Sequence, residues 1–332
     1  MSNPHETVEG GRLLREENEG RDRLEPNRPE DVVGDVCGAK NSQCLRLVTQ
    51  NINGISPTIN SFKEQSVKNF AQDFSVDIFA LQELNVCWNK VKKGEKIWDR
   101  FKGWKESHNL SVGFNAKDKN AKRYQSGGVA LLSLGKISHA CESLGADETK
   151  LGRWTWTRFQ GSYGRKFRVV SVYRPCLNTQ STESAYMKQY SYSIRERDGM
   201  CPRELFWLDL AVEIKKWKEM GDTIIVMGDF NEDVRSQAMS DWKDKVGLED
   251  MLLARVEEDG VPIQTYHRGK IPIDTILCTP GVEVYKAGYM PFGEGAGDHR
   301  PLFMDIKIAS CLGVDIPPVK SASARRLKLR DP

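Results

Sequence analysis

The sequence predicts a mixed α/β protein, and two observations lead to that expectation. Short apolar runs recur along the chain with the length typical of strands, and longer amphipathic stretches separate them. The helical period is clearest over Arg203–Glu219, where large apolar residues recur every three or four positions. Many strands with interspersed helices are typical of mixed α/β architectures.

Each element follows from its local pattern. Nine apolar runs are expected to be strands: Leu45–Gln50, Asp77–Leu81, Gly128–Ser133, Trp154–Phe159, Phe167–Tyr173, Thr223–Met227, Ile273–Leu277, Val282–Tyr289 and Leu302–Ile308. Three stretches are expected to be helices: Ser61–Phe74, Lys90–Arg100 and Arg203–Glu219. The segment Gly161–Gly164 predicts a hairpin turn between two of the strands. In the last strand the alternation places Leu302 inward and Asp305 outward.

Charge divides the chain into three parts. Residues 1–43 hold ten acids and six bases with few aliphatic clusters, so we expect a flexible charged leader. Residues 44–310 are expected to form the folded domain. Residues 311–332 contain Pro317-Pro318 followed by five Lys and Arg, which is typical of a basic tail or linker.

Composition excludes several classes of protein. The 332 residues carry a formal charge of +3, and no apolar run approaches the roughly 20 residues that a membrane-spanning helix requires. The N-terminal residues lack the apolar core of a secretory signal. The eight cysteines are scattered without a CxxC pair, which is typical of free thiols in a reducing compartment. We therefore expect a nuclear or cytoplasmic protein that is not secreted and has no membrane partner.

Polar side chains follow several of the apolar runs. One predicted strand leads to Asn51, another to Glu83, and a third to Asp229 with Asn231 two residues later. Side chains at strand ends meet at one edge of an α/β sheet, where such proteins tend to bind ligands. Taken singly, each of these acids is equally typical of a turn or a helix cap.

Two further acids stand in unusual positions. Asp274 lies inside an apolar run, where a lone carboxylate is disfavoured unless it is bonded. Asp298 directly precedes His299, and no other of the five histidines adjoins an aspartate. Oxygen ligands without clustered Cys or His favour Mg²⁺ or Mn²⁺ over Zn²⁺.

At this point the sequence resembles the endonuclease/exonuclease/phosphatase superfamily. Six motifs occur in the order of that family across residues 45–308: Thr-Gln-Asn51-Ile-Asn-Gly, Leu-Gln-Glu83, Ser-Val-Tyr173-Arg-Pro, Gly-Asp229-Phe-Asn231, Ile-Asp274-Thr-Ile and Gly-Asp298-His299. The resemblance implies a four-layer α/β sandwich of two packed mixed β-sheets flanked by helices. It also implies metal-dependent hydrolysis of phosphoesters.

The resemblance implies a role for each matching residue. Glu83 would be the main metal ligand, helped by Asn51 and Asp298. Asp229 would orient or deprotonate the attacking water, and Asn231 would hold it. The resemblance further implies that Asp274 orients His299, and that His299 and Tyr173 contact the phosphate. Whether His299 or Asp229 is the base stays open.

Three positions depart from the family pattern. Gln50 stands where the family often has Trp, and Gly297 stands where Ser usually precedes Asp-His. Abasic-site nucleases usually have an aromatic residue three positions before the equivalent of Asp274, and this chain has Ile271. The last departure argues against abasic-site specificity.

Two basic segments indicate a polyanionic substrate. Residues 86–126 and 150–174 each carry a net charge of +7 interleaved with aromatic residues, and we expect the charge to lie outside. Double-stranded DNA is the expected partner. The residues expected to contact it are Lys92, Lys93, Arg123, Arg153, Arg174 and His267.

The form of the motifs is most similar to the apurinic-type endonuclease domain of non-LTR retroelements, which implies nicking of DNA. A reverse transcriptase motif of the Tyr/Phe-x-Asp-Asp type is absent from the chain. Two alternatives remain open. One is a phosphatase that acts on a small or lipid phosphoester with the same catalytic residues. The other is a nucleic-acid-binding relic without activity.

Overall fold

Two mixed β-sheets form the centre of the protein in the computed structural model, which describes residues 32–59, 61–101, 104, 108–256 and 263–313. The first sheet has seven strands in the order β1-β12-β13-β2-β3-β5-β4. Their bounds are β1 Val33–Gly34, β2 Cys44–Asn51, β3 Ile78–Gln82, β4 His108–Gly113, β5 Val129–Leu134, β12 Val284–Tyr289 and β13 Leu302–Lys307. Only β2 and β3 pair in parallel; the other neighbours are antiparallel.

The second sheet has six strands in the order β10-β11-β9-β8-β7-β6. Their bounds are β6 Cys141–Ala146, β7 Trp154–Gln160, β8 Lys166–Tyr173, β9 Asp222–Asp229, β10 Glu249–Asp250 and β11 Asp274–Cys278. Here β8 and β9 pair in parallel and the other pairs are antiparallel. Each sheet therefore contains one parallel pair whose strands end at the same rim.

The two sheets pack face to face. Leu47 and Ala80 of the first sheet belong to the same buried cluster as Val169 and Met227 of the second. Because the opposite faces of the central strands are also covered, these strands read as continuous apolar runs in the sequence.

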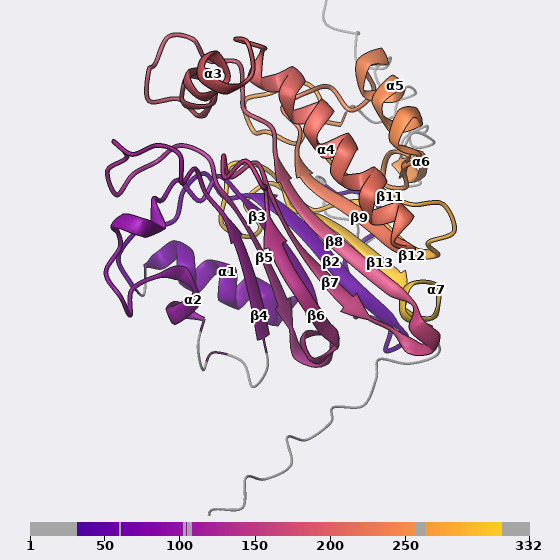
Figure 1. Ribbon diagram of the computed structural model, residues 1–332. Coiled ribbons are helices and arrows are strands. Elements are labelled where there is room, and N and C mark those ends of the chain that lie inside the picture. The colour runs from indigo at the N-terminus through magenta and orange to yellow at the C-terminus, as the bar shows by residue number, and fades with distance from the viewer. Residues whose placement is uncertain (1–31, 60, 102–103, 105–107, 257–262, 314–332) are drawn as a thin grey trace, which may run out of the picture. The chain divides into compact units, whose positions relative to one another are not determined.

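Helices cover the two outer faces (Figure 1). Helix α1 packs Val67 and Phe70 against the first sheet, and α4 packs Phe206, Leu210 and Ile214 against the second. The α-helices are α1 Phe62–Asp73, α2 Ile97–Arg100, α3 Ala185–Glu196, α4 Pro202–Glu219, α5 Gln237–Val246, α6 Leu253–Val256 and α7 Ile308–Leu312. Three short 3₁₀ turns span Trp88–Lys90, Gly135–Ala140 and Ser162–Gly164. The order helix, sheet, sheet, helix is the four-layer sandwich that the sequence motifs implied.

All nine expected strands are present, within a few residues of the expected bounds, and the hairpin joins β7 to β8. The expected helix over 90–100 is wrong for most of its length. Only the 3₁₀ turn that ends at Lys90 and the single turn of α2 are helical there. Among the described helices, none is long and apolar enough to cross a bilayer.

The folded unit extends beyond both expected boundaries. Strand β1 lies within the expected leader, and its Val33, 5 % exposed, pairs with Tyr289 at the edge of the first sheet. At the other end, Cys311 and Leu312 are fully buried in the core cluster between the sheets. Most of the expected leader and tail lies outside the described residues.

Asp305 lies on the outward face of its strand, opposite to Leu302, Met304 and Ile306, as the alternation predicts. That face is covered, however, and the carboxylate of Asp305 is fully buried. Arg46 stands directly opposite on β2 and donates two hydrogen bonds to it, Nε to Oδ1 at 2.8 Å and Nη2 to Oδ2 at 2.7 Å. A buried carboxylate requires such a partner, and alternation in one strand does not reveal it.

Candidate active site

The second sheet places three of the expected site residues side by side. Tyr173 ends β8 and stands opposite Asp229, which ends β9, and Asp229 stands opposite Asp274, which begins β11. Gly228 allows this close arrangement, because a Cβ there would lie 2.1 Å from the Val172 carbonyl oxygen. Strand register alone therefore brings a phenol and two carboxyl groups to one rim.

The first sheet contributes to the same rim. Asn51 ends β2, and Glu83 directly follows β3. The Asn51 Nδ2 donates to Asp229 Oδ2 at 2.9 Å, and the Tyr173 hydroxyl donates to Glu83 Oε1 at 2.6 Å. Both hydrogen bonds run from one sheet to the other, so the rim forms only where the two sheets are packed together.

Asp229 is held mainly by amide groups. Besides the Asn51 bond, its Oδ1 accepts from the Asn231 backbone N–H at 2.8 Å and its Oδ2 accepts from Asn231 Nδ2 at 3.2 Å. Asn231 Nδ2 also donates to the Arg174 carbonyl at 2.8 Å. The Asp229 carboxyl is 1 % exposed in this setting.

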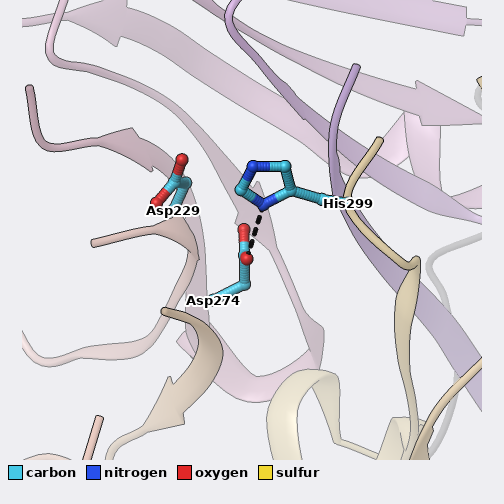
Figure 2. Close-up of side chains that lie close together, drawn as sticks. All are labelled: Asp229, Asp274 and His299. Atoms are coloured by element: carbon cyan, nitrogen blue, oxygen red, sulfur yellow. Dashed lines mark hydrogen bonds and ion pairs between the residues drawn. The ribbon is translucent and has the colours of Figure 1, made fainter. Parts of the chain in front are cut away.

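A histidine–aspartate pair lies beside Asp229, as Figure 2 shows. The Nδ1 of His299 and the Oδ2 of Asp274 are 2.7 Å apart, and both side chains are buried. Candidate ligand atoms of Asp229, Asp274 and His299 all lie within 4.8 Å of one another. Asp298, next to His299, accepts from Asn53 Nδ2 at 3.0 Å.

The charges of this group are coupled. Burial raises the pKa of Asp229 to about 8, and the nearby carboxylate of Asp274 contributes in the same direction. Burial alone would lower the pKa of His299, but the carboxylate of Asp274 outweighs it and raises that pKa to about 10. His299 is therefore an imidazolium at neutral pH, and its Nδ1–H donates to Asp274. Perturbed groups clustered in this way are typical of catalytic sites.

The backbone at the rim is held in an uncommon conformation. Asn53, Glu83, Asn85 and Asn231 have positive φ angles between 45° and 56°. Non-glycine residues adopt the left-handed region rarely and at an energetic cost. Four of the eight non-glycine residues with positive φ angles in the described chain thus lie around this group of polar side chains.

The donor set of the rim fits a hard divalent cation. Glu83 is partly exposed, and its Oε1 accepts from the Tyr173 hydroxyl. Burial lowers the pKa of Lys63, and the carboxylates of Asp298 and Glu83 oppose that shift, so both carboxylates lie near the same lysine. Carboxylate and amide oxygens are the ligands that Mg²⁺ prefers.

The residues expected to bind nucleic acid separate into two groups. Lys92, Lys93, Arg123 and His267 are exposed. The backbone N–H of His267 donates to the Asp298 carbonyl at 2.9 Å, which places this residue beside the rim. Arg123 lines a small hollow together with Tyr124, a tyrosine that is 63 % exposed.

The expectation that Arg153 and Arg174 contact nucleic acid is wrong, because both side chains are buried. Arg153 is 1 % exposed and bonds Asp147 and Asp209, and Arg174 is 5 % exposed and bonds Glu232. Neither guanidinium can contact a polyanion directly. Arg153 instead pairs with the nearby Asp147 and the distant Asp209, and Arg174 pairs with the distant Glu232.

The same finding corrects the expected basic surface over residues 150–174. Arg158 and Arg168 both bond Asp222, and Lys166 bonds Glu142. Trp154 and Phe167 belong to the core. Acids from other segments therefore neutralise much of this charge. Lys92 and Lys93 of residues 86–126, by contrast, are exposed.

Two residues contribute to the rim without having been expected there. Asn53 bonds Asp298, and its place in the Asn51-Ile-Asn-Gly motif was the available signal. Arg203 on α4 donates to the Asn231 carbonyl at 2.7 Å and to Glu232 at 2.8 Å. Arg203 lies far from every motif, so the sequence offered no signal for it.

Two packed mixed sheets with carboxylate, amide and imidazole side chains along one rim are the features of an α/β-sandwich phosphoesterase. The sequence profile of the Endonuclease/Exonuclease/phosphatase family matches residues 48–299. The chain belongs to this family. No curated protein matches the chain by sequence.

Solved structures share the fold. An AP endonuclease from Leishmania major has a TM-score of 0.60 at 12 % identity, over 80 % of this chain and 88 % of that chain. The APE2 catalytic domain of Xenopus laevis has a TM-score of 0.57 at 17 % identity, over 79 % and 92 %. The 3′ phosphatase NExo from Neisseria, bound to a product DNA hairpin, has a TM-score of 0.54 at 18 % identity, over 79 % and 99 %.

Proposed function

We propose that this protein is a Mg²⁺-dependent phosphodiesterase that nicks double-stranded DNA, in the manner of a retroelement-type endonuclease. The observation that supports it most is the convergence of Asp229, Asn231 and the His299–Asp274 pair on one rim with Glu83 and Asn51. Hydrolysis of a phosphodiester requires a positioned water and positive charge near the phosphate oxygens, and these groups supply both.

The chain's own residues divide these tasks. Asp229, held by the amides of Asn51 and Asn231, would orient the attacking water and, once ionised above its raised pKa of about 8, accept the proton of that water at a carboxylate oxygen. His299 is a cation fixed by Asp274 and would offset the charge that develops on the phosphate. The Tyr173 hydroxyl would contact the phosphate as well.

Glu83, Asn51 and Asp298 would hold the metal ion. Mg²⁺, or Mn²⁺ in its place, would supply Lewis-acid polarisation of the phosphate oxygens. The Tyr173 hydroxyl fixes one oxygen of Glu83, and Asn53 fixes one oxygen of Asp298, so both carboxylates are oriented before an ion binds.

The choice of DNA as substrate depends on exposed polar side chains. Lys92, Lys93 and Arg123 would contact backbone phosphates, because cationic side chains supply most of the affinity for a nucleic acid, and His267 would contact the DNA beside the rim. Ile271 is 39 % exposed where abasic-site nucleases usually have an aromatic residue. We therefore propose that intact DNA is the substrate.

The test is nicking of a supercoiled plasmid. We expect conversion to the open circle with Mg²⁺, none with EDTA, and no increase when the plasmid is depurinated. Glu83→Gln should lower the rate by about 10²–10⁴-fold, because it removes the ligand charge while keeping the side chain's size. Full activity of Glu83→Gln, or activity in EDTA, would contradict the proposal. Failure of the protein to bind Mg²⁺ by calorimetry would instead support a relic without activity.

A phosphatase acting on a small phosphoester is a second candidate, favoured by the neutralisation of the basic residues 150–174. Salt separates the two candidates. Binding to several DNA phosphates should weaken steeply between about 50 and 200 mM salt, whereas binding of a small phosphoester should change little.

A further inference from the structure

Gln50 links strand β2 to the loop that carries His299. It is the penultimate residue of β2 and is 1 % exposed. Its Oε1 accepts from the Ala296 N–H at 3.0 Å, and its Nε2 donates to the carbonyls of Glu294 at 3.1 Å and His299 at 2.9 Å. One side-chain amide thus bonds the start, the middle and the end of residues 294–299.

The chemistry of these three bonds requires an amide. Two of the bonds use both N–H groups of the Gln50 amide, and the third uses its oxygen. A carboxylate of the same length would lack both donors, and an apolar side chain would lack donors and acceptor alike. The partners are backbone groups, so the bonds fix the path of the loop rather than one neighbouring side chain.

Two glycines allow the loop to pass close to Gln50 and to the end of β2. A Cβ at Gly295 would lie 2.3 Å from the Gln50 Oε1, and a Cβ at Gly297 would lie 2.1 Å from the Asn51 carbonyl oxygen. The loop thus approaches the end of β2 too closely for a side chain at either position. Gln50 and Gly297, two of the three departures from the family pattern, are parts of one arrangement.

The loop held by Gln50 carries two side chains of the rim, those of His299 and Asp298. The residue whose carbonyl Gln50 holds is His299 itself, whose Nδ1 bonds Asp274. The adjacent Asp298 accepts from Asn53 Nδ2, and Gln50 is the immediate neighbour of Asn51, which bonds Asp229. A shift of the loop would move His299 and Asp298 together, away from Asp229 and Glu83.

We propose that Gln50 is a positioning residue that sets His299 and Asp298 against the end of β2 for the reaction. The proposal rests on the proposed function for its kinetic consequences. A displacement of about 1 Å in a reacting group can cost roughly 10²-fold in rate. Loss of the Gln50 bonds should therefore lower kcat more than it changes KM, because Lys92, Lys93 and Arg123, which would bind DNA, are not among the partners of Gln50.

The experiment compares Gln50→Met and Gln50→Glu with the wild type. Gln50→Met removes all three hydrogen bonds, and Gln50→Glu keeps the size and the acceptor but removes both donors. Circular dichroism checks that each variant is folded before its rate is compared. The matched control is Gln189→Met, a buried glutamine on α3 that is 4 % exposed. We expect both Gln50 variants to lose about 10–10²-fold in kcat with KM within about 3-fold, and the control to keep wild-type kcat.

A second readout does not depend on activity. The His299 Nδ1 proton in the bond to Asp274 gives a far-downfield NMR signal, assigned by its loss in Asp274→Asn. We expect this signal to shift or broaden in both Gln50 variants and to stay in place in Gln189→Met. An unchanged signal and unchanged kcat, with only a lower melting temperature, would overturn the positioning role. A wild type without nicking activity would defeat the proposed function, while the NMR comparison would still decide the role of Gln50.

Discussion

The two ends of strand β9 carry buried aspartates with opposite partners. At its start, Asp222 receives hydrogen bonds from Arg168 at 2.8 Å and from Arg158 at 2.9 Å. At its end, Asp229 is bonded by the amides of Asn51 and Asn231 and lies beside the carboxylate of Asp274. Both carboxyls are at most 5 % exposed. One strand thus holds a carboxylate that is neutralised by arginines and another that lies next to a second carboxylate.

The carboxylate at the start of β9 stabilises the fold, whereas the carboxylate at its end has a displaced pKa. A buried carboxylate paired with arginine is satisfied, and losing its partner leaves a charge without compensation. Asp229 instead has its pKa raised to about 8 by burial and by Asp274, which is the condition of a group that can exchange a proton. Substitutions at the two ends should therefore change different properties.

The largest expected effect is on activity, from Asp229→Asn. The amide keeps the size of the carboxyl but cannot accept the proton of the attacking water. The nicking rate should fall by about 10²–10⁴-fold. Thermal unfolding followed by circular dichroism should change little, since no arginine pair is broken. A variant that keeps at least half of the wild-type rate would remove Asp229 from the proposed role.

The next effect is on stability, from Asp222→Asn. The change leaves Arg168, whose side chain is 2 % exposed, without its carboxylate partner. We expect the free energy of unfolding in urea to fall by about 3 kcal/mol or more. The nicking rate per folded molecule should stay at the wild-type value. A loss of rate without a loss of stability would reverse the assigned roles of the two ends.

The dependence of stability on acid pH should identify the carboxylates that are paired with arginine. Burial alone would raise the pKa of Asp147, but the contacts with Arg153 outweigh it and lower that pKa below its ordinary value. A carboxyl group whose pKa is lower in the folded state stabilises the fold at pH values above its unfolded-state pKa, which is about 3.9. That contribution is lost as pH falls through the lower, folded-state pKa. Urea titrations should show Asp147→Asn less stable than wild type at pH 7, with the gap narrowing below about pH 4. A gap that is independent of pH would contradict this.

The smallest expected effect is on DNA affinity, from Lys92→Ala or Lys93→Ala. Both lysines are exposed, so stability should not change. Each substitution should weaken binding uniformly across sequences and reduce the slope of log affinity against log salt by about 1. Fluorescence anisotropy with labelled duplex DNA measures both. Lys215→Ala, an exposed lysine on α4, is the control and should leave the slope unchanged.

Much of the fold was predictable because its central strands are buried on both faces. Such strands appear as unbroken apolar runs, and all nine were expected near their observed positions. Strands β4 and β6 were missed because they lie toward sheet edges and have partly exposed side chains. Helix α5 was missed although Ser236 caps its start and Gly247 ends it in the left-handed conformation.

The site residues that end strands were predictable because strand ends meet at a rim. The order of motifs named Asn51, Glu83, Asp229 and Asp274, and the structure brings them together. The partners of buried arginines were not predictable. Arg153 and its acid Asp209 are 56 residues apart, so a count of local charge could not reveal that they neutralise each other.

The position of β13 has a consequence for how the molecule is made. This strand, Leu302–Lys307, lies between β2 and β12, so the first sheet lacks a strand between them until residues 302–307 have left the ribosome. A nascent chain that ends before residue 302 exposes one edge of β2 and lacks the pairing that fixes the sheet. His299 arrives with the same late segment. The rim therefore cannot assemble before this segment is made, and a shorter translation product with an exposed strand edge would be prone to aggregate.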